Sequence, residues 1–128
     1  MIDHISVAVS DIARSAAFYE RVLAPLGLHR IVDRGASVGF GKSYPELWLN
    51  LREGLAPVAE TTGIHIALRA RNEDAVRAFH AAALDHGGRD AGSPGPRQAA
   101  LTTYFGAFVF DPDGNKIEAV NFPRAETP

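Results

Sequence analysis

The strongest constraint on the fold is an internal repeat that carries a histidine in each copy. When the sequence is shifted by 61 positions, the separation of His4 from His65, pairs of like residues coincide without a gap. These pairs are His4-Ile5 with His65-Ile66, Asp11 with Asn72, Ala17-Phe18 with Ala78-Phe79, Leu23 with Leu84, and Gly27 with Gly88. Two copies are too few for a solenoid. The pattern predicts a duplicated module that closes on itself or on a second chain.

Composition limits the classes of protein to consider. The 128 residues, of which 46% are hydrophobic and 22% charged, are typical of one globular domain. A net charge of -2 with scattered Lys and Arg argues against nucleic acid or an anionic membrane as a partner. The apolar runs are shorter than the roughly 18 residues that span a bilayer, and no secretory signal pattern is seen, so a cytoplasmic protein is expected. With no cysteine, any metal must be held by His and carboxylate groups.

Hydrophobic periodicity predicts one strand, one helix and three strands in each module. The first module, residues 1–53, is expected to have strands at 2–9, 28–33, 37–41 and 46–51 and a helix at about 12–24, capped at Ser10-Asp11. Residues 54–61 are expected to link the modules. The second module, residues 62–122, is expected to have a strand from residue 63, a helix capped by Asn72, and strands at 98–103, 104–110 and 116–121. Residues 89–97, which are rich in Gly and Pro, are expected to form a loop.

Three side chains are candidate ligands of a metal. His4, His65 and Glu118 each fall on the less apolar face of an amphipathic strand. Two imidazoles and one carboxylate suit a catalytic divalent ion that keeps open positions for water or substrate. A single histidine in a strand is more often structural, and that interpretation is kept for His29, His80 and His86. The repeat favours the ligand role for His4 and His65, because duplication predicts that equivalent positions project into one interior.

Three segments resemble the vicinal oxygen chelate superfamily, which includes glyoxalases, bleomycin-resistance proteins, extradiol dioxygenases and fosfomycin-resistance transferases. They are residues 3–9 (DHISVAV) with Asp11 and Phe18-Tyr19, residues 63–68 (GIHIAL), and residues 110–118 (FDPDGNKIE). The resemblance covers nearly the whole chain. It implies an α+β fold in which two βαβββ modules form a cup-shaped, partly open barrel around a metal.

The resemblance also implies roles for particular residues. His4, His65 and Glu118 match three of the family's ligand positions, and a fourth belongs on the strand at 46–51. Glu46, Trp48 and Asn50 alternate onto one face of that strand, and the sequence leaves open which of them fills the position. Trp48 or Asn50 would give a three-ligand site, the interpretation we favour, whereas Glu46 would keep a glyoxalase-like proton shuttle possible.

Other side chains are candidates for binding the substrate or for catalysis. Aromatic residues on strands facing the cup could line an apolar pocket, and Tyr104 could donate a hydrogen bond or a proton to a bound oxygen. Arg97 could meet an anionic substrate. The candidate substrate-binding residues are Phe40, Trp48, Asn50, Arg97, Tyr104 and Phe108, and the candidate catalytic residues are Tyr104 and Glu118.

These features lead to three functional hypotheses. The favoured one is a lyase, isomerase or dioxygenase that holds Zn, Ni, Mn or Fe and chelates a small oxygenated substrate. The second is a metal-dependent thiol transferase of the fosfomycin type, for which Lys42, Ser43, Arg97, Thr102 and Thr103 would supply phosphonate contacts. The third is a metal-free, bleomycin-type binding protein. A homodimer is expected, with the site either within one chain or shared between two.

Overall fold

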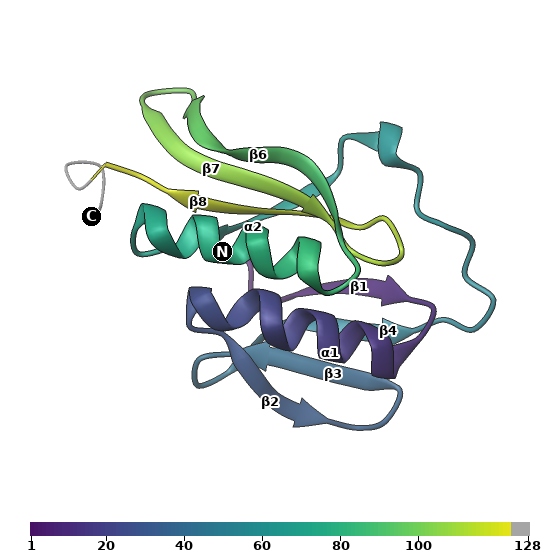
Figure 1. The fold of residues 1–128 in the computed structure, drawn as a ribbon. Coiled ribbons are helices and arrows are strands. Elements are labelled where there is room, and N and C mark those ends of the chain that lie inside the picture. Colours follow the sequence, from purple (N-terminus) through teal and green to yellow (C-terminus); the bar gives the residue numbers. More distant parts are fainter. Residues whose placement is uncertain (124–128) are drawn as a thin grey trace.

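The computed structural model describes residues 1–123 as two four-stranded sheets with two helices between them (Figure 1). The first sheet has the strand order β1-β4-β3-β2, from β1 (Ile5–Val9), β2 (His29–Asp33), β3 (Ser37–Gly41) and β4 (Pro45–Leu51). The second has the order β5-β8-β7-β6, from β5 (His65–Arg69), β6 (Arg89–Gln98), β7 (Thr103–Phe110) and β8 (Lys116–Asn121). Helix α1 (Ile12–Leu23) and helix α2 (Glu73–Asp85) each follow the first strand of their module.

The two modules share one topology, as the repeat predicts. The first and last strands of each module pair in parallel, β1 with β4 and β5 with β8, and the remaining pairs are antiparallel. The sheets stay separate and do not close into a barrel. The predicted α+β fold with two βαβββ modules is confirmed.

Side chains at the start of each helix fix where the helix begins. The Asp11 carboxylate accepts a hydrogen bond from the backbone N–H of Arg14, and the Asn72 side chain accepts one from Ala75. Each bond satisfies a backbone donor that has no partner within its helix. Asp11 and Asn72 are equivalent positions of the repeat, and both were predicted as caps. No helix in residues 1–123 is long and apolar enough to cross a membrane.

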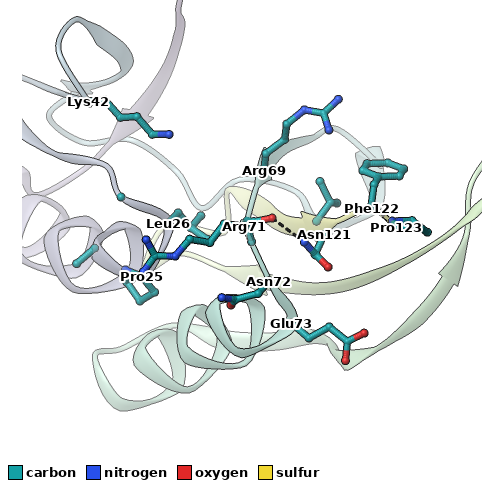
Figure 2. A pocket seen from close by; sticks show the side chains of 14 residues that line it. Pro25, Leu26, Lys42, Arg69, Arg71, Asn72, Glu73, Asn121, Phe122 and Pro123 are labelled. Atoms are coloured by element: carbon teal, nitrogen blue, oxygen red, sulfur yellow. Dashed lines mark hydrogen bonds between the residues drawn. The ribbon is translucent and has the colours of Figure 1, made fainter. Parts of the chain in front are cut away.

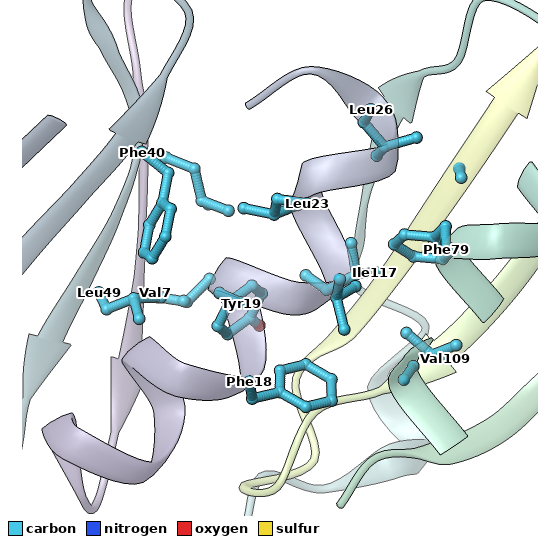
Figure 3. Packing of buried hydrophobic residues seen from close by; sticks show 14 of the residues in the cluster. Val7, Phe18, Tyr19, Leu23, Leu26, Phe40, Leu49, Phe79, Val109 and Ile117 are labelled. Atoms are coloured by element: carbon cyan, nitrogen blue, oxygen red, sulfur yellow. The ribbon is translucent and has the colours of Figure 1, made fainter. Parts of the chain in front are cut away.

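The core lies between the two sheets, around the helices. Val7 and Leu49 of the first sheet and Val109 and Ile117 of the second turn toward α1 and α2 (Figure 3). Phe18 of α1 is also buried there, and the two helices contact each other. The helix-covered faces therefore look toward one another. The other face of each sheet, which we call the free face, points away from the helices and from the other free face.

Two predicted boundaries are wrong. The first strand begins at Ile5 and not at residue 2, so His4 precedes it. Residues 89–97, predicted as a loop, belong to strand β6, and most of the strand predicted at 98–103 is instead the turn at 99–102. β6 is an edge strand whose pairing with β7 shifts register between Asp90 and Gly92 and between Gly92 and Gly95. Gly and Pro are tolerated at edges and bulges, which explains why composition alone predicted a loop.

A buried hydrogen bond joins the two modules. The Tyr19 hydroxyl of α1 donates to the Asp111 carboxylate at 2.6 Å, and both side chains are almost fully buried. Asp111 also accepts bonds from the backbone N–H groups of Asp113 and Asn115 and from the Asn115 amide. Asp113 in turn accepts bonds from Ser10 at the start of α1. The turn between β7 and β8 therefore holds the first helix in place.

Tyr19→Phe should lower the free energy of unfolding by about 2 kcal/mol at neutral pH, because a buried carboxylate loses a donor. Burial raises the pKa of Asp111, while the bond from Tyr19 acts against that rise by favouring the ionised form. The difference in stability between the two proteins should therefore shrink as the pH falls through the pKa of Asp111 in the folded state, where Asp111 takes up a proton.

Denaturant unfolding at pH 7 and at acidic pH measures this effect. Tyr44→Phe is the matched control, since its hydroxyl also bonds a carboxylate, that of Asp3, but at an exposed site. Equal losses in the two variants would contradict a structural role for the Tyr19–Asp111 bond.

Candidate functional site

The free face of the second sheet brings His65 and Glu118 together. His65 opens β5 and Glu118 lies in the middle of β8, on strands that pair in parallel with Ala67 opposite Glu118. Alternation places both side chains on the same face, and His65 Nε2 lies 3.4 Å from Glu118 Oε1. The Glu118 side chain is only 4% exposed, against 38% for His65. A carboxylate this deeply buried needs compensating partners.

The hydrogen bond made by His65 Nδ1 determines which ring nitrogen carries the proton. His65 Nδ1 lies 3.1 Å from the backbone oxygen of Gly63, and since that oxygen can only accept, Nδ1 carries the proton. In the neutral ring, the Nε2 lone pair then faces Glu118 Oε1. Two facing acceptors are stable only with a cation between them, either a proton or a metal ion. Ligand atoms about 2.1 Å from a tetrahedral ion are themselves about 3.4 Å apart, so the observed spacing fits a metal.

Tyr104 on β7 holds the other oxygen of Glu118. Its hydroxyl donates to Glu118 Oε2 at 2.6 Å. Burial, followed by the hydrogen bond to Glu118 and that group's charge, raises the pKa of Tyr104 to about 12. Tyr104 therefore keeps its proton at physiological pH and acts as a donor. Gly106 makes room for this contact, because a Cβ there would lie 2.8 Å from the Tyr104 ring and 3.2 Å from Glu118 Oε2.

His4 lies elsewhere in the chain. It is exposed just before β1, and its Nδ1 is 2.7 Å from Asp3 Oδ1. Within residues 1–123, no group of three His, Asp or Glu side chains is arranged to hold a metal. One chain thus brings together two of the three predicted ligands, and His4 is not among them.

The three candidates for the fourth position lie on the free face of the first sheet. Alternation along β4 turns Glu46, Trp48 and Asn50 away from Leu47 and Leu49, which are buried under the helices. The Trp48 ring lies under the Arg34 guanidinium, 5.4 Å from its centroid, and the Asn50 amide oxygen accepts from the Ser37 hydroxyl at 2.9 Å. This face points away from the His65–Glu118 pair of the same chain.

The remaining predicted pocket residues separate into two groups. Phe108 lies beside the pair, with its ring 5.2 Å from that of His65, edge to face, and the Arg97 guanidinium lies over Phe108 at 5.9 Å. Phe40 is instead fully buried in the core against Tyr19. It does not line the free face, because pairing with Leu47 puts it on the helix-covered side of β3.

Sequence reasoning missed three neighbours of the site, namely Arg69, Lys116 and Phe122. Alternation along β8 puts Lys116 on the same face as Glu118, and alternation along β5 puts Arg69 on the same face as His65. Both could therefore have been predicted as neighbours of the site from the sequence. Phe122 could not be placed in this way, because it follows the end of β8. In the structure its ring stacks on that of Tyr104, with 5.2 Å between the centroids.

The polar residues considered for a phosphonate site are not gathered in one chain. Lys42 and Ser43 follow β3 in the first module, whereas Arg97, Thr102 and Thr103 lie in the second module around the turn from β6 to β7. The structure of a single chain therefore does not assemble the cluster that a fosfomycin-type transferase would need.

A wide cleft lies near the end of β8, and neither His65 nor Glu118 lines it. This cleft of about 1020 Å³ opens between the two modules, near the start of α2 and the end of β8 (Figure 2). Its cationic lining residues are Lys42, Arg69 and Arg71, and Arg69 also belongs to the free face of the second sheet. A smaller cavity of about 200 Å³ borders His65 and Lys116 beneath the linker.

Comparisons with known proteins agree with this fold. Residues 1–119 match the family described as the glyoxalase/bleomycin resistance protein/dioxygenase superfamily. A solved glyoxalase/bleomycin resistance protein from Albidiferax ferrireducens T118 is similar over 94% of this chain and 98% of its own, with 28% identity and a TM-score of 0.83.

Two further structures are similar in fold alone. A family enzyme from Burkholderia phytofirmans PsJN has 16% identity, a TM-score of 0.67 and coverage of 94% of this chain and 97% of its own. A glyoxalase I mutant from Zea mays has 22% identity and a TM-score of 0.69, and the match covers 92% of this chain but 45% of the maize protein. No curated protein is similar enough in sequence to count as a match. By its family match and its fold, the chain belongs to the glyoxalase/bleomycin resistance protein/dioxygenase superfamily.

Proposed function

We propose that the protein is a metal-dependent enzyme whose site combines His65 and Glu118 of one chain with His4 of a second copy. The observation that carries this proposal is the 3.4 Å approach of His65 Nε2 to Glu118 Oε1, with Nδ1 and Oε2 already engaged by Gly63 and Tyr104. Outer hydrogen bonds of this kind orient the ligands of metal sites. The chemistry would be that of a lyase, an isomerase or a dioxygenase acting on a small oxygenated molecule.

The separation of the two free faces supports a site shared between chains. His4 and the free face of the first sheet cannot meet the His65–Glu118 pair of their own chain without rearranging the core between the sheets. A second copy can lay its first sheet opposite the second sheet of this chain, and two-fold symmetry would then form two equal sites. The predicted homodimer and a cytoplasmic location belong to the same proposal.

The residues present fit a divalent ion and assign roles around it. His65 Nε2 and Glu118 Oε1 would hold the ion, which, when bound, would polarise a substrate oxygen or stabilise an oxyanion. Tyr104 would orient Glu118 and keep a proton beside the substrate. The opposite face, from the second copy, would present Glu46, Trp48 and Asn50. Which of these three residues occupies the fourth ligand position is left undecided.

A metal-free binding protein is the second candidate. The observation that favours it is that a single chain holds only two candidate ligands together and engages His4 with Asp3. In that case a proton would occupy the space between His65 and Glu118, and the free face would bind its ligand without a metal.

Metal binding separates the two candidates. Metal-free protein titrated with Zn, Ni, Mn or Fe(II) should bind about one ion per chain, and His65→Ala and Glu118→Gln should each weaken binding by more than about a hundredfold, beyond the usual effect of outer-shell partners. His29→Ala, a change at an exposed histidine of β2, is the matched control and should bind normally. Unchanged affinity in Glu118→Gln, or no binding of any of these ions, would reject the metalloenzyme.

Mixing two variants tests whether the site is shared. His4→Ala and His65→Ala homodimers should both be defective, but exchange of subunits between them should restore about one quarter of the metal sites, because half of the dimers are mixed and each has one complete site. Metal content measured after mixing by mass spectrometry of the native dimer gives the result. No recovery in mixed dimers would place all the ligands in one chain.

Tyr104→Phe tests the orienting role. The variant should fold normally but bind metal about ten- to hundredfold more weakly, because Glu118 loses the donor that fixes Oε2. Tyr19→Phe is the control, because it removes a hydroxyl in the core that contacts none of the proposed ligands; it should lower stability but leave the metal affinity of the folded protein unchanged. Wild-type affinity in Tyr104→Phe would show that the hydroxyl has no part in orienting Glu118.

A further inference from the structure

The free face of the second sheet is positively charged although the chain as a whole is not. Arg69, Arg97 and Lys116 share this face with the buried Glu118, whereas the whole chain has a net charge of -2. A bound divalent ion would add to this excess. A site with such a charge raises the local concentration of anions.

The three cations have no carboxylate partners in the described part of the chain. Ion pairs within residues 1–123 engage Arg14, Arg30, Arg77 and Arg89, but none involves Arg69, Arg97 or Lys116. In a protein with more acidic than basic residues, three unpaired cations on one face are available to an anion from outside.

Aromatic rings and carbonyl groups hold these cations in place without neutralising them. Arg97 and Lys116 both lie over the Phe108 ring, 5.9 and 4.7 Å from its centroid, and Arg69 lies over Phe122 at 5.4 Å. The Arg97 guanidinium also donates to the backbone oxygen of Ser93 at 2.6 Å. Such contacts orient a guanidinium while leaving its charge available.

The bulged edge strand β6 makes room for Arg97. A Cβ at Gly92 would lie 3.2 Å from one guanidinium nitrogen of Arg97, and a Cβ at Gly95 would lie 3.3 Å from another. The charge of Arg97 also reaches the site, since it opposes the rise in the pKa of Tyr104. The glycines that made this segment resemble a loop are therefore part of how Arg97 is positioned.

Arg69 extends the positive surface into the neighbouring cleft. Figure 2 shows Arg69 beside Phe122 on one side of this cleft, with Lys42 and Arg71 on its other walls. Among residues 1–123, Glu73 is the one acidic residue that lines it. Arg69 therefore belongs both to the free face of the second sheet and to a cleft with two further cations.

We propose that the substrate is a small carboxylic acid whose carboxylate binds Arg97 and Lys116 and whose apolar substituent lies against Phe108. This inference rests on the proposed function, because it names the substrate class of the same site.

Mandelate and mandelamide provide a matched pair of probes, since they share one shape and differ in charge. Wild-type protein, titrated with each probe with and without metal and followed by NMR, should bind mandelate about tenfold more tightly, as expected for a charge-assisted contact. The double variant Arg97→Gln, Lys116→Gln should lose this preference and bind mandelamide as before. Arg77→Gln is the control, because Arg77 also lies over a ring, that of Phe105, but on α2. It should behave as wild type.

The outcomes distinguish this inference from the proposed function. Equal affinity for the two probes, no binding of either, or equal weakening of both in the double variant would overturn the inference, even with metal bound normally. The double variant is also expected to bind as much metal as the wild type, because neither Arg97 nor Lys116 is a proposed metal ligand. If the wild-type protein binds no metal but still prefers mandelate, the metalloenzyme is rejected and the anion site is retained.

Discussion

The chemistry of the free face depends on the burial of one carboxylate, Glu118. A group of this kind, 4% exposed in a sheet, is stable only if its oxygens are engaged. Tyr104 engages Oε2 through a short hydrogen bond, and His65 presents Nε2 to Oε1. In the proposed function, a cation lies between these two groups, while Gly63 and Tyr104 hold their outer atoms. Phe108 lies against His65 and Phe122 stacks on Tyr104, and three cations lie over these two rings.

The second constraint is the arrangement of the modules. Each strand buries one face against the helices, and α1 and α2 pack against each other between the sheets. The Tyr19–Asp111 bond and the contacts of Asp113 with Ser10 fix this arrangement. As a result, equivalent faces of the two modules point apart, which is why we propose that a second chain completes the cup. The same core that stabilises one chain thus separates His4 from His65.

Much of the fold could be predicted from the sequence, because the repeat and its periodicity are local signals. Asp11 and Asn72 were identified as caps, and alternation correctly placed Glu46, Trp48 and Asn50 on one face. Predictions failed where local signals mislead, as at β6, whose glycines belong to bulges, and at Phe40, whose register turns it into the core. For the site, the position of Glu118 next to His65 followed from strand order, which periodicity cannot supply. The ring of Phe122 over Tyr104 depends on the chain beyond the last strand, where no pattern operates.

The central claim is that the His65–Glu118 pair holds a metal together with His4 of a second chain. Crystals grown with Zn or Mn and measured at the metal's absorption edge test it most directly. The account predicts an anomalous peak about 2.1 Å from His65 Nε2 and Glu118 Oε1, with a His4 ring of a symmetry-related chain as the next ligand. A peak elsewhere, or an empty His65–Glu118 pair at saturating metal, would contradict it.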